Sequence, residues 1–159
     1  MADRDAEIRK ELIFHLNGGN AHVKFEEAVD GFPAKLTGAI PQGLPYSAWQ
    51  LLEHLRIAQE DIVQFCDNAN GRYVPPEWPE YYWSKSPAPP TPSAWSDSVR
   101  RVLEDRNRFI SLLNKGDLFA PFPWGDGQTL LREAMVVIDH NSYHIGQIVA
   151  VRRLLNAWS

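Results

Sequence analysis

The sequence Asp139-His140-Asn141-Ser142-Tyr143-His144-Ile145-Gly146-Gln147 lies in the last long helical stretch of the chain. Residues four apart on a helix share one face, with Cβ atoms roughly 5–6 Å apart, so His140 and His144 direct two imidazoles toward one point. Two imidazoles are half of a transition-metal site, which needs at least one further protein ligand. The candidate for that third donor is His54.

His54 lies in a second strongly helical stretch. Ser47 followed by Gln50 predicts a capping box at its start, and the apolar pattern continues to about Asn68 or Asn70. The neighbours of His54 at helical spacing are apolar, among them Leu51 and Leu55, so its ring is expected to face the interior.

The depths of the three histidines agree if these two helices are antiparallel. From Asn70 back to His54 is roughly 24 Å, while from Thr129 forward to His140 and His144 is roughly 16 and 22 Å. The three rings then fall within about one helical turn of one another. The sequence therefore predicts that they form one cluster.

The whole chain reads as helices joined by loops, because no run alternates at period two for long enough to predict a strand. We predict an all-α fold, a single domain over residues 1–159 with four long helices. The segments predicted as helices are Asp3–Asn17, a short Ala21–Val29, Ser47 to about Asn68 or Asn70, Ser93–Lys115 and Thr129 to about Ala157.

Residues 71–92 hold seven prolines, which exclude a helix there. At about 3.1 Å per residue this segment can span the whole preceding helix, which is roughly 35 Å long. The predicted topology is therefore an up-down-down-up four-helix bundle with a long Pro-rich crossover between the second and third long helices. Four aromatic side chains in the crossover are expected to be buried: Trp78, Tyr81, Tyr82 and Trp83.

Composition excludes several classes of partner. The net charge is -4, the pI is about 5.7 and no Lys/Arg-rich run occurs, so we expect no nucleic-acid and no membrane partner. The chain contains a single cysteine, Cys66, and begins with charged residues, which predicts a reduced, cytoplasmic protein. Cys66 lies roughly 18 Å along the helix from His54 and cannot share its site.

The chain resembles the DinB-like family of damage-inducible metalloproteins, also called the DinB/YfiT superfamily. The resemblance covers nearly the full length and is carried by residues 46–55, 139–147 and Arg152-Arg153-Leu154-Leu155. It implies a four-helix bundle of up-down-down-up topology, a divalent metal held by three histidines and frequent dimers. The ligand positions of the family match His54, His140 and His144. Characterised relatives include thiol S-transferases that use bacillithiol or mycothiol, and a mycothiol-dependent maleylpyruvate isomerase.

Three neutral imidazoles without a fourth protein ligand are typical of a catalytic metal centre, and zinc, nickel and iron(II) all suit them. One hypothesis is a divalent-metal-dependent thiol S-transferase or hydrolase that acts on a small electrophilic substrate, with a low-molecular-weight thiol as co-substrate in the first case. The other hypothesis is a non-catalytic, metal-stabilised bundle that binds a ligand or partner in a stress response. The absence of a convincing general base from the sequence pattern favours the second.

Three further residues are weaker candidates for a site. Gln147 lies one turn beyond His144 and either holds a ligand ring or a bound water, or makes an ordinary interhelical hydrogen bond. His22 either roofs the cleft or caps and packs, and Arg106 either binds an anionic substrate or forms a structural ion pair. A core position is expected for His15.

Overall fold

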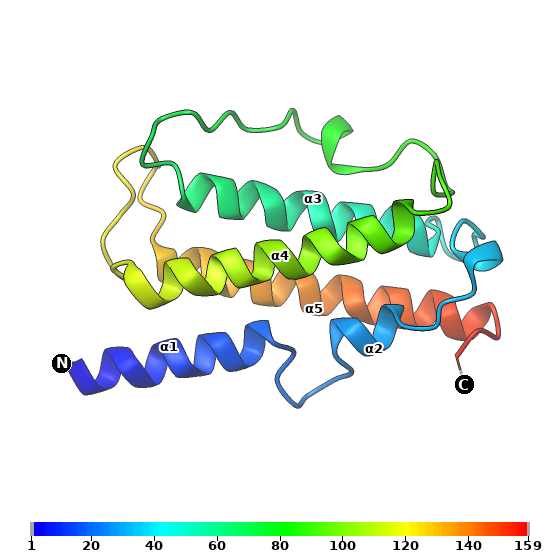
Figure 1. Ribbon diagram of the computed structural model, residues 1–159, viewed down its shortest axis with the longest axis horizontal. Coiled ribbons are helices and arrows are strands. Elements are labelled where there is room, and N and C mark those ends of the chain that lie inside the picture. Colours follow the sequence, from blue (N-terminus) through cyan, green and yellow to red (C-terminus); the bar gives the residue numbers. More distant parts are fainter. Residues whose placement is uncertain (1, 159) are drawn as a thin grey trace.

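The computed structural model describes residues 2–158, which form a bundle of helices (Figure 1). The four long helices are α1 (Ala2–Leu16), α3 (Ala48–Cys66), α4 (Ala94–Lys115) and α5 (Leu130–Leu154). The short elements are the helix α2 (Phe25–Val29) and the 3₁₀ helices η1 (Ala34–Leu36) and η2 (Glu80–Tyr82). Within residues 2–158 no strand forms, and one isolated β-bridge joins Pro121 to Thr129. The prediction of an all-α protein with four main helices is confirmed.

The starts of α3 and α5 follow from their capping residues. The side chain of Ser47 accepts a hydrogen bond from the backbone N–H of Gln50, and the Gln50 side chain accepts one from the backbone N–H of Ser47, which completes the predicted capping box. Thr129 caps α5 by accepting from the N–H of Arg132. The helix ends are less accurate, since α3 stops at Cys66 and α5 at Leu154, a few residues before the predicted positions.

The predicted helix Ala21–Val29 is only half correct. The helix begins at Phe25, with Lys24 in extended conformation before it. Residues 17–22 instead form turns in which Gly18 and Gly19 both have positive φ. Two left-handed residues in succession redirect the chain after α1, so the helix starts later than the Asn20 cap would place it.

The core consists of two clusters of buried apolar side chains at the two ends of the bundle. The first contains residues of α2 and the loop after it, the first half of α3, α4 and the end of α5: Phe25, Ala28, Val29, Phe32, Ala48, Trp49, Leu51, Leu52, Leu55, Val102, Ile145, Ile148 and Val151. The second contains residues of α1, the end of α3, the end of α4 and the start of α5: Leu12, Leu16, Val63, Cys66, Phe109, Leu113, Leu118, Leu130, Ala134 and Val137. On α5, His140 and His144 lie between the two clusters, and on α3 His54 is adjacent to Leu55, the last α3 residue of the first cluster.

The linker between α3 and α4, residues 67–93, lies along the outer side of α3 (Figure 1). Near the end of α3, the Tyr73 hydroxyl donates a hydrogen bond to Asp61, at 2.7 Å. Near the start of α3, the Ser47 hydroxyl donates to the carbonyl of Pro87, at 2.5 Å. The linker is therefore fixed to α3 at both ends of that helix.

The expected burial of the linker aromatics is wrong for two of the four. Trp78 and Tyr81 are 69% and 65% exposed, whereas Tyr82 and Trp83 are half-buried. The difference arises because Tyr82 and Trp83 contact α3, while the side chains of Trp78 and Tyr81 project from the turn that contains η2. Proline fixes the backbone there, but it does not decide which rings face the bundle.

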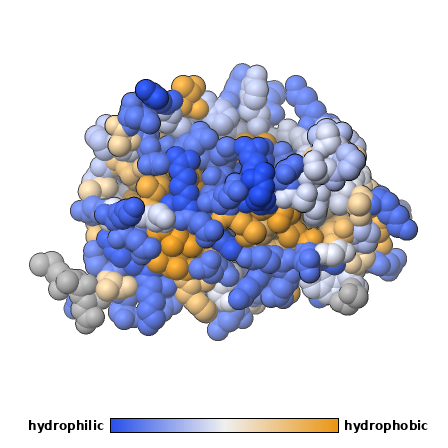
Figure 2. Space-filling view, in the orientation of Figure 1, coloured by the Kyte–Doolittle hydropathy of each residue, from blue (hydrophilic) through white to orange (hydrophobic). Residues whose placement is uncertain are grey.

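The surface shown in Figure 2 is mostly hydrophilic, with hydrophobic atoms visible in a band across its middle. Singly exposed apolar side chains are normal on folded proteins and identify no partner by themselves. No helix within residues 2–158 is both long enough and apolar enough to cross a membrane.

Candidate metal centre

His54 of α3 meets His140 and His144 of α5 in a compact cluster. One side-chain nitrogen from each residue lies within 4.8 Å of the other two, and His54 and His144 are buried. The ring centroids are 4.4–5.0 Å apart. The depth argument from helix lengths is therefore confirmed, and three imidazoles from two helices converge on one point.

Hydrogen bonds set the orientation of two of the rings. The Nδ1–H of His54 donates to the backbone carbonyl of Tyr82 at 2.9 Å, and the Nδ1–H of His144 donates to Oε1 of Gln147 at 2.7 Å. Because Nδ1 is the donor in each ring, the lone pair of the neutral imidazole lies on Nε2. Metal-binding histidines are commonly held through the second ring nitrogen in this way.

The spacing of the nitrogens fits a shared divalent cation. Nε2 of His54 and Nε2 of His140 are 3.1 Å apart. Two nitrogens bound at about 2.0–2.1 Å to one ion lie roughly 2.9–3.4 Å apart, in octahedral or tetrahedral geometry. No carboxylate or thiol within residues 2–158 joins the cluster, so the donors are three imidazoles.

The environment keeps these rings neutral. Burial lowers the pKa of His54, and burial together with the neighbouring His54 ring lowers the pKa of His140. For His144, burial and the other two histidines lower the pKa to about 4. Neutral imidazole is the form that binds a metal, so the cluster is in its binding form at pH 7.

An aromatic stack supports the His54 ring. Trp83 lies parallel to His54, with centroids 3.9 Å apart and an interplanar angle of 5°. Tyr46 stacks on the other face of Trp83, at 4.3 Å and 18°. Both faces of the Trp83 ring are therefore covered by the protein, and Trp83 acts as a wall of the site rather than as a free platform for a ligand.

A family model described as the DinB superfamily matches residues 20–148, which is more than half of the chain and includes all three histidines. The chain belongs to the DinB superfamily. This confirms the resemblance drawn from residues 46–55 and 139–147. No curated protein and no solved structure gives a significant match to the chain. Membership in the DinB superfamily therefore assigns no particular reaction to the chain.

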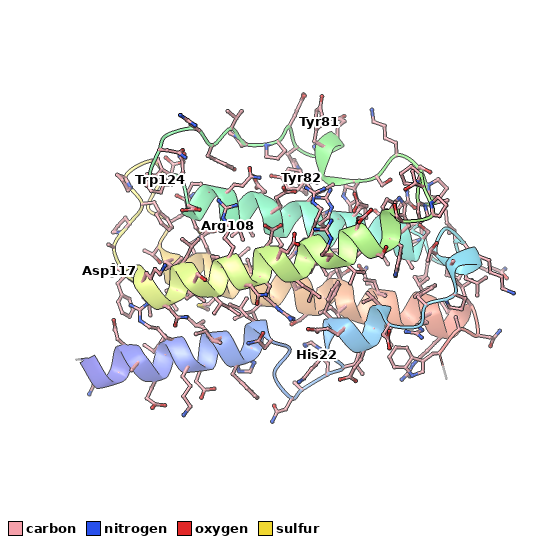
Figure 3. The ribbon with its side chains drawn as sticks, in the orientation of Figure 1. His22, Tyr81, Tyr82, Arg108, Asp117 and Trp124 are labelled. Atoms are coloured by element: carbon pink, nitrogen blue, oxygen red, sulfur yellow. The ribbon has the colours of Figure 1, made fainter. Side chains whose placement is uncertain are left out.

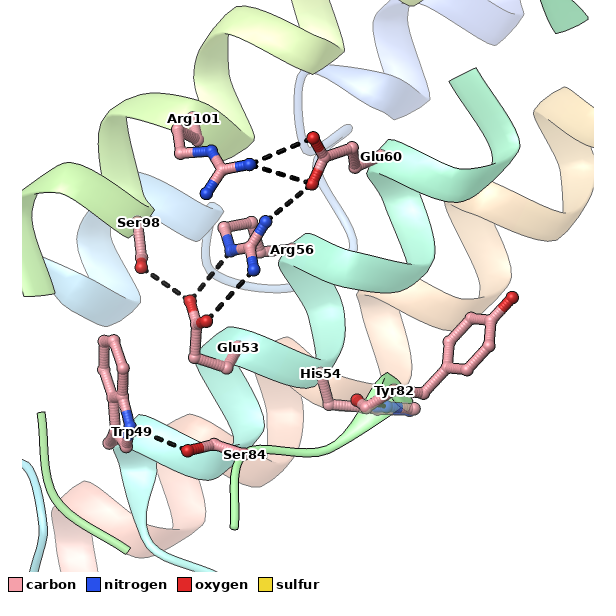
Figure 4. Close-up of polar contacts among 9 residues, drawn as sticks. All are labelled: Trp49, Glu53, His54, Arg56, Glu60, Tyr82, Ser84, Ser98 and Arg101. Carbon is pink, nitrogen blue, oxygen red and sulfur yellow. Dashed lines mark hydrogen bonds and ion pairs between the residues drawn. The ribbon is translucent and has the colours of Figure 1, made fainter. Parts of the chain in front are cut away.

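Glu53, although adjacent in sequence to a histidine of this DinB-superfamily site, faces α4 (Figure 4). Its carboxylate accepts two hydrogen bonds from Arg56, at 2.8 and 3.1 Å, and one from the Ser98 hydroxyl at 2.6 Å. Arg56 donates in turn to Glu60 at 2.7 Å. Adjacent helical residues point about 100° apart, so Glu53 joins α3 to α4 and is not part of the histidine cluster.

The structure does not bring His22 and Arg106 to the three histidines. Nε2 of His22 lies 3.1 Å from the Ser142 hydroxyl, which is two residues from His140 and therefore on the opposite face of α5. Figure 3 shows His22 on the other side of the bundle from Tyr82. Arg106 forms an ion pair with Glu26 at 2.5 Å, which is the structural ion pair and not the anion-binding role.

Two other sequence expectations concern residues outside the cluster. The core position expected for His15 is wrong: its side chain is exposed because the neighbouring Leu16 occupies the buried side of the last turn of α1. Cys66 is buried in the second apolar cluster, away from the histidines, as predicted. Burial raises the pKa of its thiol, which makes Cys66 a packing residue rather than a nucleophile.

Two contacts that shape the DinB-superfamily site could not be predicted from the sequence. The His54 ring is held by the backbone carbonyl of Tyr82, and a carbonyl group leaves no signature in sequence. Trp83 was expected only as a buried ring of the linker. The adjacent pair Tyr82-Trp83, following the proline-rich stretch, was the available signal that the linker reaches the site.

Proposed function

We propose that this protein is a divalent-metal-dependent enzyme that activates water or a low-molecular-weight thiol toward a small electrophilic substrate. The observation that carries the proposal is the convergence of three neutral imidazoles, two of which, His54 and His144, are already held at their outward nitrogens by hydrogen bonds. Three protein ligands leave coordination positions for other molecules, which is the pattern of a catalytic rather than a structural metal. Zinc, nickel and iron(II) all suit this set of donors.

His54, His140 and His144 would hold the cation. A cation bound there would act as a Lewis acid and would lower the pKa of the water or thiol that it coordinates. Other groups of the protein orient the metal ligands. The Tyr82 carbonyl holds the His54 ring, Gln147 holds the His144 ring, and Trp83 shields one side of His54 from water. Thiol transfer and hydrolysis differ in which nucleophile enters the open position.

We assign the bundle the up-down-down-up topology with a Pro-rich crossover. The path of the linker along α3 and the course of the ribbon colours in Figure 1 support this assignment. We also propose a homodimer, on the strength of the resemblance, which size-exclusion chromatography with light scattering can test.

A non-catalytic, metal-stabilised bundle that binds a ligand or partner is the second candidate. It is favoured by one observation: within residues 2–158, no carboxylate oxygen joins the three histidine nitrogens that lie within 4.8 Å of one another. Glu53, which is adjacent in sequence to His54, is bonded to Arg56 and Ser98.

Metal binding is tested first, with protein purified without a nickel column. We expect elemental analysis to find a divalent transition metal, and added zinc, nickel or iron(II) to raise the Tm of metal-free protein. At a metal concentration of about 100 times Kd the stabilisation is about 2.7 kcal/mol, or roughly 5–11 °C for a chain of this size. His140→Ala should abolish this shift, while His22→Ala, outside the cluster, should keep it. No bound metal and no thermal shift in the unsubstituted protein would refute the site.

Catalysis is tested next, by incubating the metal-loaded protein with a thiol and monochlorobimane or a chloro-dinitrobenzene. Conjugation faster than with the metal-free protein would support thiol transfer. The absence of conjugation with glutathione, cysteine, bacillithiol and mycothiol would count against thiol transfer. Hydrolysis and the non-catalytic candidate would then remain, and they are distinguished by assaying a panel of activated esters and amides.

A further inference from the structure

Tyr82 connects the linker to α3 at two points two turns apart. Its backbone carbonyl accepts the hydrogen bond from His54, and its hydroxyl donates to Oδ2 of Asp61 at 2.6 Å. Asp61 is seven residues after His54 on α3, about two turns along the same face. One linker residue thus joins a ring of the histidine cluster to a carboxylate roughly 10 Å away along the helix.

Asp61 holds the linker with both of its oxygens. Tyr73 donates to Oδ1 at 2.7 Å, while Tyr82 donates to Oδ2. Burial and the nearby carboxylate raise the pKa of both phenols, so both remain protonated donors at neutral pH. We call these three residues, Asp61, Tyr73 and Tyr82, the Asp61 clamp.

The Asp61 clamp affects the orientation of the His54 ring as well as the path of the linker, because Trp83 directly follows Tyr82 in the chain. Tyr82 fixes the His54 ring by a hydrogen bond at Nδ1, and Trp83 fixes its plane by stacking against one face. Neither contact comes from the helices that carry the histidines. The orientation of His54 therefore depends on a linker segment that is held down by Asp61.

We propose that Asp61 and Tyr82 are positioning residues of the three-histidine centre, so that docking of linker residues 73–84 sets the affinity of this centre for its divalent cation. This inference rests on the proposed metal-binding function. Tyr73 shares the carboxylate but has no direct contact with His54, so it anchors the linker without orienting the ring. Coupling between two events in one molecule is reciprocal, so cation binding must also strengthen docking of the linker.

The structure offers a matched pair of variants, Tyr82→Phe and Tyr73→Phe. Each removes one phenol hydroxyl that donates to Asp61, so both should lower the Tm of metal-free protein by similar amounts. Zinc affinity, measured by competition with a chromophoric chelator, should fall by up to about 10-fold in Tyr82→Phe, the lower end of the effect of losing an outer partner of a metal ligand. The carbonyl that accepts from His54 is still present in this variant, but Asp61 no longer holds it in place. In Tyr73→Phe the affinity should change by less than about 2-fold, because Tyr82, whose carbonyl accepts from His54, is still bonded to Asp61.

Limited trypsin digestion gives a second readout that is independent of activity. Arg72 and Lys85 are exposed and flank the docked segment. Zinc should slow cleavage at both sites in the unsubstituted protein and in Tyr73→Phe, and should protect Tyr82→Phe much less. Equal zinc affinities in the two variants, or cleavage unaffected by zinc in unsubstituted protein that binds it, would overturn the proposal while leaving the metal centre intact. Failure of the unsubstituted protein to bind zinc, nickel or iron(II) would overturn both.

Discussion

Replacement of Glu53 by glutamine tests how much stability the buried charges between α3 and α4 contribute. The side chains of Glu53 and Arg56 are only 13% and 9% exposed, and Glu53 accepts three hydrogen bonds from Arg56 and Ser98. Removing one partner of a buried ion pair costs about 3–5 kcal/mol when the other is left unpaired. Arg56 keeps Glu60 at 2.7 Å, so we expect about half of that, roughly 2 kcal/mol, and a Tm lower by about 4–8 °C.

The assay is urea unfolding of the metal-free protein at pH 7, followed by circular dichroism. Glu104→Gln is the matched control, because Glu104 pairs with Arg100 on α4 where both side chains are 58% exposed. Such an exposed pair contributes about 0.2–1 kcal/mol. If Glu53→Gln costs no more than Glu104→Gln, the buried network does not stabilise the bundle in the way that its geometry indicates.

The same variant predicts a pH dependence. Burial alone raises the pKa of Glu53, but the hydrogen bonds and charge of Arg56 and the Ser98 hydroxyl outweigh it, so the net pKa lies below 4.5. The unfolded chain therefore binds a proton first as the pH falls, and the stabilisation by Glu53 is present above pH 4.5 and is lost below it. The stability difference between the unsubstituted protein and Glu53→Gln should shrink between pH 7 and pH 3. A difference that stays constant would contradict this assignment.

Two further predictions concern single residues. Gln147→Leu removes the acceptor of the His144 Nδ1–H and should weaken zinc binding about 10-fold in a chelator competition, and an unchanged affinity would show that Gln147 does not orient the ring. Cys66 should not react with an aromatic disulfide reagent in the native protein and should react fully in urea, because burial raises its pKa; rapid labelling of native protein would show that the thiol is accessible.

The cluster of three histidines was predictable because its determinants are local and regular. The spacing of His140 and His144 follows from helical periodicity, and the depth of His54 follows from the start of its helix at Ser47 and the rise per residue. Because the rise per residue of an α-helix is constant, the predicted position of a residue along the helix axis stays accurate over about four turns. Capping boxes and apolar stripes therefore place side chains on long helices well enough to bring residues from two helices together.

The sequence predictions that proved wrong concern segments whose conformation depends on contacts outside regular structure. The helix α2 begins at Phe25 because Gly18 and Gly19 turn the chain first, a choice that Asn20 as a cap does not reveal. In the linker, the exposure of Trp78 and the burial of Trp83 depend on which side of the backbone faces α3. Proline restricts φ but gives no period by which inward and outward residues can be distinguished.

Nε2 of His54 and Nε2 of His140, which are 3.1 Å apart, belong to residues 86 positions apart in the chain. A cation between them would close a long loop, and closing such a loop is possible only after α5 has docked beside α3. A metal ion would therefore not nucleate folding of this protein, since its ligands meet late. It would instead act on unfolding, because α3 and α5 could not separate without releasing the ion, so metal should lengthen the lifetime of the native bundle more than it speeds refolding.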